Sequence, residues 1–274
     1  MTRAVETPKQ VEEHREKVTR AHRVRNAADL VKLVDALGFA FAFTLRTGDA
    51  PIPACFDHLS TNDTNRKWNW MWGWKDELPE EKKLYYGVLL ARKPTFVSMK
   101  MLPTFYATFG RAGEADDHEA DVRGGRLSDV ARRIIEFLAQ NGETQTKRMR
   151  AELGITSKEG RAAYAKAIDD VQRLMYVARV RAVGEFREDY NYTYDLFVRR
   201  YPETVKSAER LTSADATAAL VLRTLELAGS VTEKQLVRLF DWDEAVAQRA
   251  IARAESERKL VRRDGSLVLP KLIA

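Results

Sequence analysis

Residues 128–183 read SDVARRIIEFLAQNGETQTKRMRAELGITSKEGRAAYAKAIDDVQRLMYVARVRAV. Ser128 is a favourable N-cap for a first helix whose apolar residues recur every three or four positions. Thr144 or Thr146 then opens a short second helix. A longer third helix follows, and two strand-like runs extend to residue 197. This order of elements predicts a winged helix-turn-helix.

The same order recurs in residues 214–269. Thr232 caps the second helix of this copy, and Asp241 or Asp243 caps the third. The two closing strands are joined by Asp-Gly, which accepts the positive φ angles of a type I′ turn. We therefore predict a mainly α protein with small β wings (α+β), built from tandem winged helix-turn-helix domains.

The N-terminal part carries helix and strand signals of its own. The first helix is expected from Thr7-Pro8 to about Arg25, and a second between Asn26 as N-cap and Gly38 as C′ residue. The run FAFAF follows as a strand, then a hairpin of YYGVLL and TFVSMK and a short helix. The predicted divisions are an N-terminal helical, winged-helix-like domain at 1–110, an acidic, Gly-rich linker at 111–125, and winged-helix domains at 126–205 and 210–274.

Composition narrows the classes of function. The 46 Lys and Arg outnumber the 40 Asp and Glu, which favours an anionic partner. One cysteine and four scattered histidines exclude an internal disulfide and argue against a metal enzyme. No apolar run approaches the roughly 20 residues that span a bilayer, and no glycine loop for a phosphate or dinucleotide cofactor is present. We expect a cytoplasmic protein without a membrane segment, metal or cofactor.

The third helix of the first repeat is the strongest candidate for contact with DNA. Thr156 and Glu159 have capping-box spacing, so it should begin there. Its basic side chains are interleaved with alanines that permit close approach to a major groove, although a solvated helix face is the alternative interpretation. The basic residues are Lys158, Arg161, Lys166 and Arg173.

Further cations fall in the strands and in the second copy. Arg179, Arg181 and Arg187 in the first wing are candidates for phosphate contact. Arg249 and Arg253 take the equivalent place on the long helix of the second copy. Acidic neighbours interrupt that second patch, so it is the weaker candidate, and packing against the first copy is the alternative interpretation.

The run WNWMWGW (68–74) places a Trp at every second position, so a strand would put all four indoles on one face. Such a face can stack an extruded base, with Trp70 and Trp74 as the candidates, whereas core packing is the more common role of Trp. Lys75, Asp76 and Glu77 follow directly, and Asp76 and Glu77 are the carboxylates we would test first for catalysis. The acid-rich segment from Asp116 to Asp121 lacks the spacing of a cation-binding loop and is expected to be a solvated linker.

Several phrases resemble the winged-helix DNA glycosylases of the AlkZ/YcaQ type, and more closely their compact AlkZ-related relatives. The phrases are LGFAFAF, PIPACFDHL, WGWKDELP, LYYGVLLARKPTFVSMKMLPTFY, TKRMRAELGI, YAKAIDDVQRLMYV and RRYPE. The resemblance implies stacked winged helices that cradle double-stranded DNA, including damaged duplexes. It also implies a Gln-x-Gln or Gln-x-Asp motif that positions water for base excision.

This chain departs from that motif. None of its six glutamines is followed two positions later by Gln or Asp, and the matching segment reads GFAFAF. The leading hypothesis is therefore a DNA-binding protein of tandem winged helices related to these repair enzymes. The alternatives are an active glycosylase that uses a different carboxylate, and a transcription regulator or protein-interaction scaffold.

Overall fold

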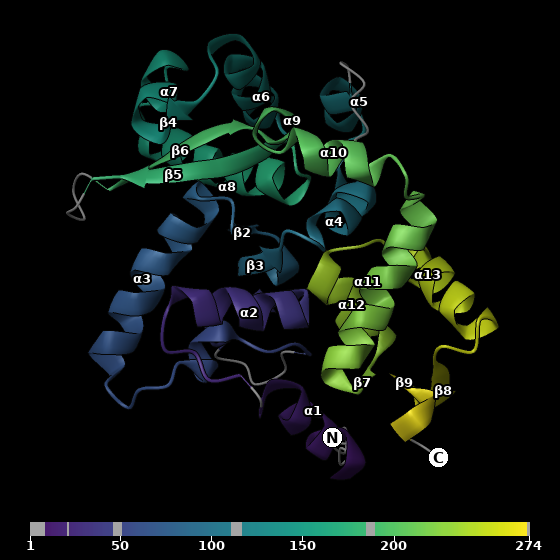
Figure 1. Cartoon of the computed structure of the whole chain (residues 1–274). Helices are drawn as coiled ribbons and strands as arrows, with labels where there is room; N and C mark the ends of the chain where they lie inside the picture. The colour runs from purple at the N-terminus through teal and green to yellow at the C-terminus, as the bar shows by residue number, and fades with distance from the viewer. Residues whose placement is uncertain (1–8, 21, 46–50, 111–116, 185–189, 273–274) are drawn as a thin grey trace.

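The computed structural model describes residues 9–20, 22–45, 51–110, 117–184 and 190–272. Its strands form three separate three-stranded antiparallel sheets, in the orders β1-β3-β2, β4-β6-β5 and β7-β9-β8. In each sheet the last strand along the chain lies between the other two. Along the chain, a helix precedes each sheet, and a long helix lies between the first and second strands of that sheet. The same arrangement therefore occurs three times (Figure 1).

The first unit begins after the N-terminal helix α1 (Lys9–Arg20). Asn26 caps its first helix by accepting a hydrogen bond from the Asp29 amide at 2.9 Å, and Gly38 ends that helix with φ +80°. Both features confirm the local expectation. The unit and the short helix after it comprise α2 (Ala27–Leu37), β1 (Phe39–Phe41), η1 (Cys55–His58), α3 (Thr64–Glu80), β2 (Leu84–Val88), η2 (Leu90–Arg92), β3 (Pro94–Ser98) and α4 (Leu102–Phe109).

The second unit contains residues 128–183, the first predicted winged helix-turn-helix. The Ser128 hydroxyl caps α6 by accepting from the Ala131 amide at 3.2 Å, as expected. The unit and the short helices around it comprise α5 (Asp117–Arg123), α6 (Asp129–Asn141), β4 (Thr144–Gln145), α7 (Thr146–Glu152), α8 (Lys158–Arg173), β5 (Val177–Val183), β6 (Asn191–Leu196), α9 (Phe197–Arg200) and α10 (Pro202–Ala208).

The third unit repeats the second in a shorter form. Thr232 and Gln235 form a reciprocal capping box at the start of α12. Asp264 and Gly265 have φ +48° and +77°, as a type I′ turn requires. The elements are α11 (Ser213–Ala228), β7 (Ser230–Val231), α12 (Glu233–Phe240), α13 (Glu244–Ser256), β8 (Val261–Arg263), β9 (Ser266–Val268) and η3 (Pro270–Leu272).

The buried apolar residues form two clusters. One is continuous through the first and third units and includes Ala178 and Phe197 of the second. In it, α4 and α11 pack together, and the ring centroids of Phe39 and Phe240 lie 6.3 Å apart. The other lies within the second unit, between α6, α8 and its sheet. None of the helices in the described ranges is long and apolar enough to cross a membrane.

Two local expectations in the N-terminal half are wrong. The first helix ends at Arg20 instead of about Arg25, because Val24 leaves the helix and bridges Leu59; its predicted start at Thr7-Pro8 lies outside the described residues. The tryptophan run is a helix, α3, and not a strand. Met71, Trp74 and Leu78 recur with helical spacing and are buried, so the 3.6-residue period outweighs the alternation of the indoles.

Two local expectations in the second unit also need correction. Part of the expected linker, Asp117–Arg123, is the helix α5, because Asp121 is buried and accepts hydrogen bonds from Arg126 and from the Tyr176 hydroxyl. The N-cap of α8 is Ser157 and not Thr156, since its hydroxyl accepts from the Gly160 amide at 2.9 Å.

Candidate nucleic-acid interface

The outer side of α8 carries exposed cations beside exposed alanines. Lys158, Arg161 and Lys166 are all exposed, and helical spacing places them on one side with Ala162 and Ala165. The opposite side, with Tyr164, Ala167 and Val171, is buried against the second core cluster. Three of the four basic residues predicted on this helix therefore form a solvent-facing stripe, which we call the α8 stripe.

The fourth, Arg173, belongs to an ion cluster that joins the three units. Its guanidinium lies 3.7 Å from the Asp170 carboxylate and 3.2 Å from that of Asp241. Arg92 of the first unit contacts the same two carboxylates at 2.9 and 3.0 Å. Arg173 is therefore engaged in holding α8 against its neighbours. The cluster lines a cleft of about 990 Å³ between the units, and the lining of this cleft carries both basic and acidic side chains.

The two described arginines of β5 differ in environment. Arg179 is buried, with its guanidinium carbon 3.5 Å from the ring centroid of Tyr192 and 4.8 Å from that of Tyr86. Arg181 is half exposed and forms an ion pair with Glu143 at 2.6 Å. Of these two, only Arg181 reaches solvent. Arg187 lies outside the described residues.

The equivalent helix of the third unit is less basic at its surface. Arg249 is exposed, but Arg253 pairs with Asp215 and, at 3.5 Å, with Glu257. The buried side of α13 is made of Ala247, Ala250, Ile251 and Ala254, and it packs closely against α11. The two copies recognised in the sequence therefore present unequal positive surfaces.

The four tryptophans of α3 divide into two pairs, one on each side of the helix. Trp70 and Trp74 stack on each other with centroids 5.3 Å apart and face the core, where Trp74 is buried. Trp68 and Trp72 are 46% and 52% exposed. Helical geometry thus brings to the surface the two indoles that were not chosen as base-stacking candidates.

Asp76 belongs to a cluster between α3 and the second unit's sheet. The Lys75 ammonium donates to both carboxylate oxygens of Asp76, at 2.9 and 2.8 Å, and also to the hydroxyls of Tyr190 and Tyr192. It lies 4.0 Å from the ring centroid of Trp72. The Tyr190 hydroxyl in turn donates to Asp76. We call these five residues the Lys75 cluster.

Burial and charge set the chemistry of the Lys75 cluster. The Lys75 side chain is 2% exposed and that of Asp76 is 16% exposed, so this carboxylate keeps a small opening to solvent. Burial and the adjacent Asp76 raise the pKa of Tyr190 well above its ordinary value, so the phenol stays protonated at neutral pH. Glu77, the other candidate carboxylate, is exposed and lies on a different side of α3.

The partners in this cluster were not predicted, because they are more than a hundred residues apart in the sequence. Lys75 was noted only as a neighbour of Asp76, and no local pattern links it to Tyr190 or Tyr192. The one signal available was a lysine flanked by apolar residues at helical spacing, which places it on the buried side once α3 is known to be a helix.

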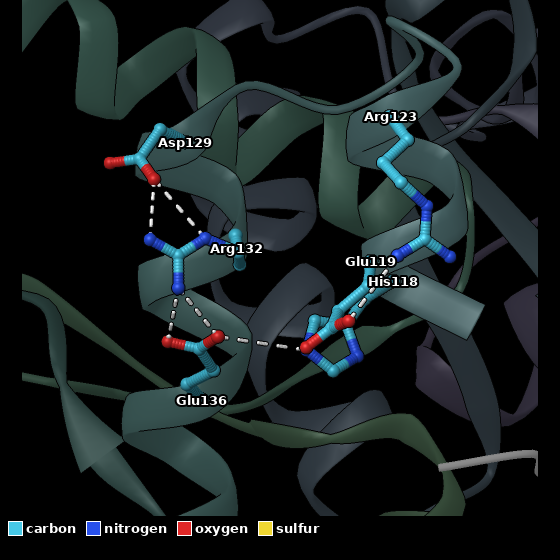
Figure 2. Close-up of polar contacts among 6 residues, drawn as sticks. All are labelled: His118, Glu119, Arg123, Asp129, Arg132 and Glu136. Atoms are coloured by element: carbon cyan, nitrogen blue, oxygen red, sulfur yellow. Dashed lines mark hydrogen bonds and ion pairs between the residues drawn. The ribbon is translucent and has the colours of Figure 1, made fainter. Parts of the chain in front are cut away.

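The acid-rich segment is engaged in ion pairs and hydrogen bonds. In Figure 2, Glu136 of α6 accepts from Arg132 at 2.8 and 3.0 Å and faces His118 of α5 at 3.8 Å. Glu119 pairs with Arg123 within α5. Within the described ranges, no three His, Cys, Asp or Glu side chains are grouped as a metal site. Asp116 lies outside those ranges.

The strand β1, where the resemblance predicts a glutamine motif, is apolar and buried. Phe39 and Phe41 of β1 are fully enclosed, and β1 pairs with β3 over three residues. Phe39 also packs edge-to-face on Phe105, with centroids 5.3 Å apart. Neither side chain carries a polar atom, so β1 itself has no side-chain group that can position a water molecule.

These features define an α+β protein of three similar helical units, each closed by a small sheet, with a basic helix exposed on the second unit. The family model described as AlkZ related matches residues 24–241, and the chain belongs to this AlkZ-related family. Its fold is similar to that of the Streptomyces sahachiroi DNA glycosylase AlkZ, with a TM-score of 0.57 and 11% sequence identity, covering 97% of this chain and 71% of that one. No curated protein matches the sequence.

Proposed function

We propose that this protein is a DNA-repair-related protein that binds double-stranded DNA through the α7–α8 helix-turn-helix of tandem winged-helix units. The observation that carries the proposal is the α8 stripe, which exposes Lys158, Arg161 and Lys166 on the helix that enters the major groove in winged-helix complexes. Membership of the AlkZ-related family and the fold shared with a DNA glycosylase support the assignment to repair.

The chemistry of the stripe fits a duplex. Lysine and arginine side chains bind phosphates or guanine edges, and the methyl groups of Ala162 and Ala165 leave room for the groove wall. The Ser157 cap and the buried face of α8 fix the helix rigidly on its unit, so the cations are held in one register. Phosphate contacts then dominate affinity, and binding weakens with salt.

The test is fluorescence anisotropy with a labelled duplex at several salt concentrations. Each phosphate contact contributes about 0.9 to the slope of log affinity against log salt, so changing Lys158, Arg161 and Lys166 to Ala lowers the slope by about 2.7. Over a fourfold rise in salt, the wild type then loses about 40-fold more affinity than the variant. The exposed residues Lys9, Lys17 and Lys32 provide a control with the same change in charge, which leaves the slope within about one contact of the wild type.

Salt-insensitive binding, or no binding to any duplex, overturns the proposal. Equal loss in the stripe variant and in the control variant also overturns it, because the effect is then one of net charge and not of α8. A duplex with and without a single alkylated base, measured in parallel, tests the assignment to repair.

A second candidate is base excision with Asp76 as the catalytic carboxylate. The Asp76 carboxylate is held by Lys75 and Tyr190 and is partly open to solvent. It lies one helical turn from the exposed Trp72, and this arrangement favours the second candidate. A carboxylate so placed can activate water against the N-glycosidic bond of an extruded base. The assay is alkali-induced strand scission after incubation with alkylated or crosslinked duplex. Asp76→Asn abolishes scission while Glu77→Gln retains it, and full activity in both variants refutes the site.

A further inference from the structure

The helix α3 occupies in the first unit the place that α8 occupies in the second. Along the chain, α2, β1, α3, β2 and β3 follow the order of α6, β4, α8, β5 and β6, and the strand order in the two sheets is the same. In winged-helix complexes the helix in this position is the one that enters the major groove. What α3 exposes is therefore relevant to ligand recognition.

One exposed side of α3 carries aromatic and amide side chains, whereas the α8 stripe is basic. Helical spacing of four residues places three of its side chains in one row and two in the adjacent row. All are exposed except the carboxylate, which is partly exposed. We call this set the α3 face, and its members are Asn65, Trp68, Asn69, Trp72 and Asp76.

Both indoles of the α3 face are held in place from behind. Trp68 stacks on Phe43 with centroids 5.4 Å apart at 22°, and it also contacts Phe56 at 4.8 Å. Trp72 contacts Tyr190 at 5.5 Å and carries the Lys75 ammonium 4.0 Å from its ring centroid. About half of each indole nevertheless remains in solvent. Rigid, exposed indoles are platforms on which a planar ring can stack with little loss of side-chain entropy.

The carboxylate beside them has hydrogen-bonding capacity left. Asp76 Oδ2 accepts from both Lys75 and Tyr190, whereas among the described residues Oδ1 accepts only from Lys75. A carboxylate oxygen has two acceptor sites, so Oδ1 retains one. Asp76 follows Trp72 by one helical turn, so the carboxylate lies in the same row of α3 as that indole.

We propose that the α3 face binds an unpaired nucleobase, which stacks on Trp72 and donates its exocyclic amino group to Asp76 Oδ1. The side-chain amide of Asn69 lies beside this position and can pair with a base edge. An anionic lipid headgroup is disfavoured by the carboxylate, and an apolar protein surface is disfavoured by the two amides and Asp76. The inference rests on the proposed function, since the unpaired base belongs to the DNA whose duplex part is bound by α8.

The experiment compares three duplexes of the same sequence: fully paired, with one bulged adenine, and with one bulged purine that lacks the amino group. Stacking on one indole strengthens binding of the adenine bulge roughly fivefold or more over the paired duplex, and the purine bulge falls between them. Trp72→Ala abolishes this preference and leaves affinity for the paired duplex unchanged, whereas Trp72→Phe keeps part of it. Val198→Ala, which truncates an exposed apolar side chain elsewhere, is the matched control and leaves all three affinities unchanged.

A bulged 2-aminopurine gives an independent readout, because its fluorescence is quenched when it stacks on an indole. The wild type quenches it strongly and Trp72→Ala does not. Equal affinity of the wild type for paired and bulged duplexes overturns the inference while leaving duplex binding by α8 intact. If the wild type does not bind the paired duplex but binds the bulged duplex in a way that depends on Trp72, the proposed function is overturned and the inference about the α3 face is supported. If Trp72→Ala does not fold, the base series and Trp72→Phe decide the question.

Discussion

Replacing Lys75 by Met tests whether the Lys75 cluster holds the β5–β6 hairpin on α3. The ammonium is almost fully buried and donates to Asp76, Tyr190 and Tyr192, while a methionine of similar length fills the same space without charge. The change therefore leaves the Asp76 carboxylate with the Tyr190 hydroxyl as its remaining partner in the cluster. What is measured is the cost of that unpaired charge.

The magnitude follows from burial. Removing one partner of a fully buried ion pair costs roughly 3–5 kcal/mol, because the other charge is left uncompensated. About a sixth of the Asp76 side chain is exposed and Tyr190 still donates to it, so we expect a value near the lower end, about 3 kcal/mol. Asp76→Asn leaves Lys75 without a counter-charge and costs a similar amount. The double variant removes both charges and recovers most of the loss, to within roughly 1 kcal/mol of the wild type.

The assay is urea unfolding at pH 7, followed by circular dichroism, for the wild type, the two single variants and the double variant. With single-variant costs of about 3 kcal/mol each and a double-variant cost of about 1 kcal/mol, the coupling free energy from this cycle is expected to be about 5 kcal/mol. Hydrogen exchange shows which part of the structure is destabilised. In Lys75→Met, the backbone amides of β5 and β6 should lose more protection than those of α11. A single-variant cost below about 1 kcal/mol, or additive effects in the double variant, would refute the reasoning.

Three further outcomes are expected from local geometry. Ser157→Ala costs about 1 kcal/mol in thermal unfolding, whereas Thr156→Ala costs much less, because only the serine hydroxyl caps α8. Asp170→Asn destabilises more than Asp241→Asn, since the former carboxylate is 10% exposed and the latter 40%. The difference widens in 0.5 M NaCl, because salt screens the exposed pair more than the buried one. Burial lowers the pKa of His58, so it contributes stability above pH 6.5 that is lost as the pH falls. The free energy of unfolding, measured from pH 7 down to pH 5, should therefore decline less steeply in His58→Gln than in the wild type.

The elements of the fold were predictable where short-range signals decide the backbone. The Asn26 and Ser128 caps, the Thr232 capping box and the positive-φ pair Asp264-Gly265 are all fixed by residues within four positions of each other. Such signals act before any tertiary contact forms. They were sufficient to recognise the repeated order of helices and strands in the second and third units.

The prediction of a strand at the tryptophan run failed because it depended on which side of that element is buried. Alternating tryptophans favour a strand when read alone, but the core of the first unit selects the helix that buries Met71, Trp74 and Leu78. That choice also decides which indoles reach solvent. The Lys75 cluster depends on the sheet of the second unit reaching α3, which only the assembled chain provides. No local pattern contains that information.

One topological position has acquired three different surfaces in this chain, and burial explains the division. The helix α13 buries its small residues against α11 and pairs Arg253 with Asp215, so little of its positive charge is available. The helix α8 buries one side in its own unit and keeps its cations in solvent. The helix α3 turns Trp70 and Trp74 toward the core and leaves Trp68 and Trp72 half exposed. Under the proposed function, phosphate and groove contacts at α8 hold the duplex without a polar side chain on β1, where phenylalanines fill the core. The α3 face is then the surface we propose for an unpaired base.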